Sequence, residues 1–252
     1  MMEKEEQMIL RHLVDLANEC AQREYPVFSD FLNLNEQSIF LSHREELPAV
    51  SFHFEGGYPL AERRMVCFMP SGAGYQCPAP LCLLKIAPVH AKFAEELTHR
   101  DYLGTLLGLG IERSKIGDIL VQGDSAFVFC TEGMDRYIEE HLDRVRRTSV
   151  RCIRQEISQL SWEPRFKSVR GSVASARLDA VISLAFHASR SSMAGLIKGE
   201  KVFVNGKAVA SAGYSLKEGD VVSVRGYGKF IYRGISQQTR KGRYFAEIDV
   251  FE

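Results

Sequence analysis

The first 75 residues combine one helical pattern with several short strand-like runs. Four apolar residues recur at the spacing of a single helix face: Met8, Leu13, Leu16 and Cys20. They predict a helix from about Glu3 to Arg23, which Pro26 ends. Three short runs then predict strands: Ser38–Leu41, Ala49–Phe54 and Met65–Met69. This pattern predicts a small α+β domain over residues 1–75, and the Pro- and Gly-rich stretch 70–80 reads as a linker.

Residues 80–160 alternate between the two periods in a more regular order. Apolar runs predict strands at Leu81–Ile86, Ile119–Val121, Ala126–Cys130 and Val150–Ile157. Helical spacing is expected over Val89–Leu109, with a start or restart at the Thr98-x-x-Asp101 capping signal, and again around Ile138. The order strand, helix, strand, strand, helix, strand predicts a ferredoxin-like (RRM-like) domain.

The last segment, residues 169–252, begins with two helical patterns. Ala180–Phe186 forms the first, and Ser189 is a good N-cap for the second, which Gly199 ends. Two strands around Asn205-Gly206 follow, because this dipeptide favours a type I′ hairpin turn. Further strands are expected at Val221–Arg225, Phe230–Tyr232 and Tyr244–Val250. The whole chain is therefore expected to be an α+β protein of three domains.

Composition narrows the class of protein. At 252 residues, with 45% apolar and 25% charged residues, the chain has the profile of a globular protein without a membrane-spanning run. The acidic start Met1–Glu6 does not resemble a secretory signal. The six cysteines are scattered without metal-ligand spacing. We expect a cytoplasmic monomer with reduced thiols and with neither a metal site nor a cofactor.

Charge is distributed unevenly although the net charge is zero. Residues 165–252 contain 15 Lys and Arg against 7 Asp and Glu, whereas residues 1–164 contain 17 against 25. Such asymmetry indicates that the C-terminal part meets a polyanion. The acidic N-terminal domain is a candidate surface for a protein partner.

The C-terminal segment carries an ordered set of motifs. These are Arg177-Leu178-Asp179, Ser189-Arg190, Lys198-Gly199, Val204-Asn205-Gly206-Lys207 and Gly219-Asp220. The set resembles the S-four domain, named for a small-subunit ribosomal protein, and predicts an αα-β domain with an added β hairpin. The resemblance implies that structured RNA is bound by eight residues: Arg177, Ser189, Arg190, Ser191, Lys198, Lys201, Asn205 and Lys207.

Independent chemistry supports this assignment. Guanidinium and ammonium groups pair with phosphates, and the amides at the Ser189 helix start form an anion site. The basic turn at Thr239–Arg243 adds Arg240, Lys241 and Arg243 as a second phosphate contact, or as a solvated turn. Asp179 is expected to have a structural role, orienting Arg177 or capping its helix.

The central domain offers a weaker RNA signal. Phe127 and Phe129 lie two apart on one predicted strand and so share a face, as the base-stacking aromatic residues of RRM domains do. The basic Lys/Arg-Gly start of the usual motif is missing. Packing of both rings against a neighbouring domain or the core is therefore the preferred interpretation.

Three further motifs extend the resemblance towards the N-terminus: Gly56-Gly57-Tyr58 with Ala61-Glu62-Arg63, His99–Gly104, and Leu107–Ile111 with Ile116–Ile119. With the C-terminal module, they resemble the YlmH-type RNA-binding proteins of Gram-positive bacteria. That resemblance implies a non-enzymatic binder of rRNA or tRNA on the large ribosomal subunit. It would act in quality control of stalled translation, with a link to cell division.

Two other function classes stay open. An RNA-modifying or tRNA-charging enzyme could use the module as an anchor, and His90, His99, Asp101 and Asp118 are the cluster to test as catalytic. However, only about 27 residues follow Arg225, and no nucleotide-binding signature is present. The second alternative is a protein–protein adaptor in which RNA is incidental, against which the basic C-terminal segment argues.

Overall fold

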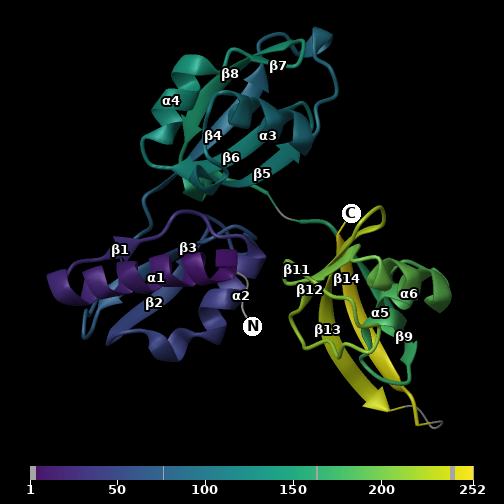
Figure 1. Ribbon diagram of the computed structural model, residues 1–252. Coiled ribbons are helices and arrows are strands. Elements are labelled where there is room, and N and C mark those ends of the chain that lie inside the picture. The colour runs from purple at the N-terminus through teal and green to yellow at the C-terminus, as the bar shows by residue number, and fades with distance from the viewer. Residues whose placement is uncertain (1–3, 76, 163, 239–241, 252) are drawn as a thin grey trace. The chain divides into compact units, whose positions relative to one another are not determined.

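The structure is a computed structural model that describes residues 4–75, 77–162, 164–238 and 242–251. The chain forms two compact units, residues 1–162 and 163–252, each with its own sheets and helices (Figure 1). In the described part of the chain, no helix is long and apolar enough to cross a membrane. The mixed α+β class expected from the sequence is confirmed.

The first unit begins with a three-stranded antiparallel sheet of order β1-β3-β2 and two helices. Its elements are α1 (Lys4–Arg23), β1 (Val27–Phe28), α2 (Leu34–Ser42), β2 (Val50–Glu55) and β3 (Met65–Pro70). Leu13 and Ala17 of α1 are fully buried against Phe68 of the sheet, so one helix face covers one sheet face. The expected first helix and the strands near Val50 and Met65 are confirmed.

The strand expected at Ser38–Leu41 is wrong, because this segment belongs to α2. Asn33 starts that helix with a capping box: its side-chain oxygen accepts from Glu36 N at 3.0 Å, and the Glu36 carboxylate accepts from Asn33 N at 2.6 Å. Two satisfied amide groups outweigh the strand propensity of a four-residue apolar run.

The second sheet of this unit has the order β5-β6-β4-β8-β7 and is antiparallel throughout. Its elements are β4 (Leu81–Pro88), α3 (His99–Gly108), β5 (Ile116–Gln122), β6 (Ser125–Thr131), α4 (Met134–His141), β7 (Arg144–Val145) and β8 (Thr148–Gln155). Without the short β7, the strand order is that of a ferredoxin-like fold, as expected. Both helices pack on one sheet face, over Leu84, Ile86 and Val128.

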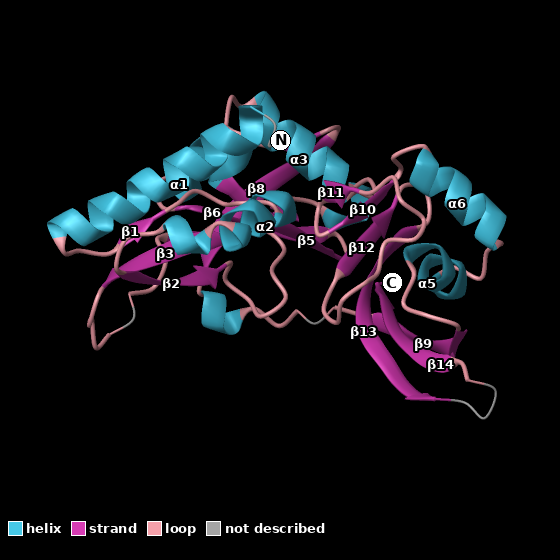
Figure 2. Ribbon diagram, turned by 60° about the horizontal axis from the view of Figure 1, so that its bottom comes forward, coloured by secondary structure: helices cyan, strands magenta, loops and turns pink. Residues whose placement is uncertain are grey.

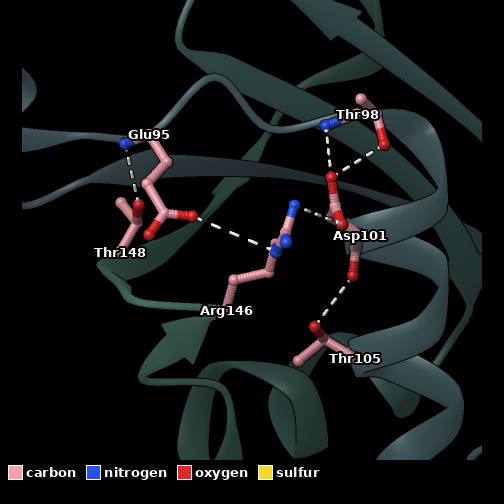
Figure 3. Close-up of polar contacts among 6 residues, drawn as sticks. All are labelled: Glu95, Thr98, Asp101, Thr105, Arg146 and Thr148. Atoms are coloured by element: carbon pink, nitrogen blue, oxygen red, sulfur yellow. Dashed lines mark hydrogen bonds and ion pairs between the residues drawn. The ribbon is translucent and has the colours of Figure 1, made fainter.

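The helix expected over Val89–Leu109 is shorter than predicted. Its first half is loop with a single 3₁₀ turn at Ala91–Phe93, and α3 begins directly after Thr98. Asp101 explains this boundary, since its carboxylate accepts hydrogen bonds from both the amide and the hydroxyl of Thr98, at 2.8 and 2.7 Å (Figure 3). The capping signal at Thr98 and Asp101 therefore marks the first residue of the helix, not a restart within it.

The two sheets of the first unit share a second core. Phe31 and Met65 pack there with Leu83 and Phe129 of the second sheet. Tyr58 stacks on the Phe129 ring at 5.5 Å between centroids, which buries Phe129 completely. Phe127 is partly buried and packs against the same core, so the preferred interpretation, packing rather than base stacking, is confirmed for both rings. Separate folding of residues 1–75 and 80–160 stays a prediction.

Asp118 stabilises the junction between the two sheets through polar contacts. Its carboxylate accepts hydrogen bonds from the Tyr58 hydroxyl at 2.7 Å, from Glu62 N at 2.7 Å and from Arg63 N at 3.1 Å. Gly57 has φ +88°, and a Cβ there would lie 2.3 Å from the Phe129 ring. The motifs around Tyr58 and Asp118 therefore have a structural role.

The second unit is a six-stranded antiparallel sheet of order β11-β10-β12-β13-β14-β9, with two helices packed on it (Figures 1 and 2). Its elements are β9 (Phe166–Val173), α5 (Leu178–Ala185), α6 (Arg190–Lys198), β10 (Val202–Val204), β11 (Lys207–Ala208), β12 (Val221–Val224), β13 (Gly228–Gln238) and β14 (Tyr244–Phe251). A continuous core joins Val181 and Ile197 of the helices to Phe230 and Ile248 of the sheet. The expected helices, hairpin and later strands are confirmed.

One strand of this unit was not expected. β9 pairs with β14 along eight residues, from Phe166↔Phe251 to Val173↔Tyr244. Its solvent-facing positions are polar and its buried positions are few, Val169 and Val173, so the period-two signal is faint. The pairing extends the sheet beyond the expected domain start at residue 169.

Candidate RNA-binding surface

The start of α6 gathers hydroxyl and amide groups at one point. Ser189 is the N-cap residue in extended conformation, and its hydroxyl accepts a hydrogen bond from Ser192 N at 3.2 Å. The Ser191 hydroxyl lies 3.1 Å from that of Ser189. Two hydroxyl groups, the first-turn amides and the positive end of the helix dipole therefore meet where Arg190 begins the helix.

Asp179 joins two of the predicted RNA-binding arginines. Its carboxylate receives Arg177 Nε at 3.0 Å on one oxygen and Arg190 Nη2 at 2.8 Å on the other. Burial raises the pKa of the Asp179 carboxyl, but hydrogen bonds from both arginines outweigh this and lower the pKa below its usual range. We call these three residues the Asp179 cluster.

The Asp179 cluster leaves both arginines accessible. The Arg177 and Arg190 side chains keep 48% and 57% of their surface exposed, against 10% for Asp179. Three unit charges meet there with a net of +1. The buried carboxylate thus orients two guanidinium groups while their remaining N–H groups can reach a phosphate.

Asn205 holds the hairpin rather than pointing to solvent. It and Gly206 have φ +50° and +79°, as the turn requires. Its side-chain amide donates to Asp220 at 2.9 Å, and its side-chain oxygen accepts from Val221 N at 3.0 Å. The turn brings Lys207 onto β11, where it is exposed. The Asn205 side chain is therefore a structural element first, and its contact with RNA stays a prediction.

Lys198 and Lys201 flank the loop between α6 and β10. Lys198 is the last residue of the helix, where a cation is favourable beside the carbonyl groups. Glu200 between them has φ +54°, which turns the chain sharply into β10. Both lysines are exposed.

Arg190 and Arg243 line one cavity although they lie 53 positions apart in the sequence. The cavity measures about 700 Å³ and lies where the end of β9, the α5–α6 loop and the start of β14 meet. Arg243 donates to the Ser172 carbonyl at 2.6 Å, which fixes its direction. Arg240 and Lys241, the other residues of the predicted basic turn, lie outside the described residues.

Sequence reasoning missed the residues that complete this cavity. His187 lines it with φ +50°, and Ser172, Ser183 and Ala188 contribute the rest of the wall near Arg190. None belongs to a short motif, and only the unpredicted strand β9 brings Ser172 to the site. The alternation of polar and apolar residues over 166–173 is the signal in the sequence that predicts β9, and with it the position of Ser172.

Among the described residues, His53, Glu55 and Cys67 are the group that could hold a metal ion, with ligand atoms within 4.8 Å of one another. These atoms already have other roles. Glu55 accepts from Ala79 N at 2.9 Å, and burial raises the pKa of the Cys67 thiol to about 12, so the thiol is protonated at neutral pH.

The aspartates of the cluster considered for catalysis have structural partners. Asp101 caps α3 and lies 3.5 Å from the Arg146 guanidinium, and Asp118 accepts three hydrogen bonds at the junction of the two sheets. The Asp101 carboxylate therefore stabilises the start of α3, and the Asp118 carboxylate stabilises the junction of the two sheets.

Comparison with known proteins gives consistent matches. Residues 80–159 match the family described as putative RNA-binding domain in YlmH, and residues 176–222 match the S4 domain. Ribosome-associated protein quality control protein P2 of Bacillus subtilis (strain 168) is 28% identical over 228 residues, which cover 88% of this chain and 87% of the relative.

A solved structure is also similar. Cell division protein ylmH from Streptococcus pneumoniae has 22% identity and a TM-score of 0.49, over 63% of this chain and 96% of that chain. The two matched domains follow one another along the chain in the order expected from the motifs. The chain therefore carries a YlmH-type putative RNA-binding domain followed by a C-terminal S4 domain, the combination that its motifs predict.

Proposed function

We propose that this protein is a non-enzymatic factor that binds structured rRNA or tRNA through the start of α6 and the loop from Lys198 to Lys207. Its place of action would be the large ribosomal subunit in the cytoplasm, in quality control of stalled translation. The observation that carries the proposal is the Asp179 cluster beside the α6 N-terminus. The name of the Bacillus subtilis relative supports the cellular role.

The chemistry of the surface favours a duplex backbone over a small ligand. Arg177 and Arg190 present a pair of forked donors, and Lys198 and Lys201 add exposed point charges at the loop between α6 and β10. Several exposed cations of this kind suit phosphates, whose contacts position an RNA without reading its sequence. We therefore expect recognition of RNA shape.

The double substitution Arg190→Glu with Lys201→Glu tests the surface. Because two phosphate contacts become repulsive, affinity for a structured tRNA or rRNA hairpin should fall at least about a hundredfold at moderate salt. Fluorescence anisotropy over a salt series measures it. The matched control is Arg165→Glu with Lys167→Glu, which reverses the same charge at the exposed start of β9.

Comparison of the two double variants shows whether RNA binding depends on the α6 surface or only on the net charge of the protein. An equal loss in both double variants would assign binding to overall charge and contradict the surface. Unchanged affinity in the first variant, with an unchanged melting temperature, would contradict it as well.

The ribosomal role needs a cellular measurement. Gradient sedimentation of lysates should place the tagged protein with large subunits, and cross-linking should recover tRNA or rRNA. The Arg190→Glu, Lys201→Glu variant should move to the top of the gradient. Co-migration that persists in this variant would instead indicate docking through another surface, with the acidic N-terminal domain and a protein partner as the first candidate.

A further inference from the structure

Three metal-ligating side chains lie together on the face of the β1-β3-β2 sheet that is turned away from α1. His53 and Glu55 lie two apart on β2 and therefore point to the same sheet face. Cys67 of β3 lies directly opposite His53 in the antiparallel register of these neighbouring strands (Figure 1). An imidazole nitrogen, a carboxylate oxygen and a thiol sulfur thus lie within 4.8 Å of one another. The ladder between the two strands fixes the positions of all three side chains.

The separations of these atoms are close to those of a tetrahedral zinc site. Zinc bonds to imidazole, carboxylate and thiolate measure about 2.0–2.3 Å, so two ligand atoms of one tetrahedral ion lie about 3.3–3.8 Å apart. His53 Nε2 lies 3.8 Å from Glu55 Oε2. Side-chain movements of about 1 Å are therefore enough to bring the three ligand atoms to one ion.

The surroundings of the group favour zinc over a hard cation. Cys67 is fully buried in the core shared by the two sheets. The side chains of His53 and Glu55 keep 30% and 34% of their surface exposed, so an ion can enter from solvent on their side. Thiolate and imidazole ligands suit zinc, whereas magnesium and calcium prefer sites made of oxygen atoms alone.

Cys77 is in position to supply a fourth ligand. It lies in the segment between β3 and β4, two residues before Ala79, whose amide donates to Glu55 Oε2 at 2.9 Å. That hydrogen bond holds the segment beside β2, and two residues of chain span at most about 7 Å. The Cys77 thiol is half-buried and contributes electrostatically to the raised pKa of the Cys67 thiol, which places the two cysteines near one another.

The contacts that these groups already make are compatible with a bound cation. Glu55 meets both His53 and the Ala79 amide through Oε2, so Oε1 can bind an ion without breaking either contact. A thiol that is protonated in the metal-free protein loses its proton on coordination. Zinc affinity should therefore rise with pH, because protons leave the cysteines when the ion binds.

We propose that His53, Glu55, Cys67 and Cys77 bind one zinc ion, a site that goes beyond the proposed RNA-binding function. The ligands come from β2, β3 and the segment that leads into β4, so the ion joins the two sheets of the first unit. Its role is structural, because four protein ligands leave no position for a substrate. The spacing of the cysteines along the chain did not predict this site, because strand pairing and not a short linear motif brings the ligands together.

The test uses the untagged full-length chain, kept reduced and stripped of metal with EDTA, and cobalt(II) as the probe. Cobalt(II) occupies the same tetrahedral sites as zinc and, unlike zinc, absorbs visible light there. One equivalent should produce the strong d–d bands of tetrahedral cobalt together with a thiolate-to-cobalt charge-transfer band, and added zinc should abolish both. Saturating zinc should also raise the melting temperature, because it binds the folded state.

His53→Gln is the decisive variant, because this partly exposed residue can be replaced without disturbing the core. It should lower cobalt affinity at least about a hundredfold, since even substitutions outside the ligand set cost about 10- to 100-fold. Cys67→Ser should have the same effect, and Cys77→Ser should lower affinity at least about tenfold and halve the charge-transfer absorbance. The matched control is His90→Gln with Cys152→Ser, which changes the same residue types elsewhere in the first unit and should leave both signals unchanged.

Three outcomes would overturn the zinc site: no tetrahedral cobalt bands in the parent chain, only the weak spectrum of octahedral hydrated cobalt, or equal affinities in His53→Gln and the control. An unchanged charge-transfer band in Cys77→Ser would overturn the four-ligand set. The Arg190→Glu, Lys201→Glu variant should bind cobalt as the parent does, so the zinc site and the RNA-binding surface are decided separately.

Discussion

At the residue scale, Asp179 has the most informative side chain. A negative charge at an RNA surface repels phosphate, yet here it is buried and holds two arginines at 3.0 and 2.8 Å. The carboxylate therefore has two opposed effects on RNA binding: it repels phosphate, and it orients Arg177 and Arg190. A substitution that removes its charge shows which effect is larger.

Asp179→Asn should weaken binding of structured RNA about three- to tenfold, although it raises the net charge by one. The reason is that neutral amide contacts hold guanidinium groups less firmly than a carboxylate does. Anisotropy at matched salt measures the change. Tighter binding in this variant would show that overall charge outweighs the orientation of Arg177 and Arg190.

Gly57 makes a steric prediction at the same scale. Gly57→Ala places a methyl group 2.3 Å from the Phe129 ring at φ +88°, so the free energy of unfolding should fall by at least about 2 kcal/mol. Urea denaturation measures it. Gly104→Ala in α3 is the control: its Cβ meets no atom within 4 Å, and it should stabilise by about 0.5–1 kcal/mol.

At the element scale, local chemistry predicted boundaries well where a cap or turn set them. Ser189, Asn205-Gly206 and Thr98 each satisfy or orient nearby backbone groups, so their signals were sufficient. At Ser38–Leu41 the apolar run predicts a strand, whereas the capping box of Asn33 and Glu36 starts a helix there. Capping outweighs hydrophobicity at this position because it satisfies two amide groups of the first turn.

Asn33→Ala follows from that correction. It removes the hydrogen bond to Glu36 N and should cost about 1 kcal/mol of stability. Ser38→Ala, on the same helix but away from its capped end, should change stability by less than about 0.5 kcal/mol. Equal losses in thermal or chemical unfolding would contradict the capping role of Asn33.

Long-range pairing was beyond the reach of sequence patterns. β9 acquires its partner β14 across about 80 residues, and Phe129 is buried by Tyr58 from a different sheet. Nothing within either segment specifies these contacts, because each is a property of two segments together. The same reason explains why the cavity that joins Arg190 and Arg243 was not foreseen, although both residues were selected.

At the scale of the whole molecule, the charge distribution along the chain is more detailed than an acidic half followed by a basic half. The second unit is basic, and the first is acidic except for the β7–β8 hairpin. The first unit can thus attract a phosphate locally and still avoid polyanions elsewhere on its surface.

The second unit should fold and bind alone. Its core of buried residues, from Val169 to Ile248, is complete within residues 163–252. We expect this fragment to unfold cooperatively in circular dichroism and to keep structured-RNA affinity within about threefold of the full chain. A molten fragment, without a cooperative transition, would contradict this independence.

The pairing of β9 with β14 has a mechanical consequence. These are the first and last strands of the second unit, and Phe166 lies opposite Phe251, so both chain ends of the unit meet at one end of this strand pair. Ladder hydrogen bonds of an antiparallel pair run perpendicular to the strands, so a force that pulls the two ends apart would open this pair one residue pair at a time.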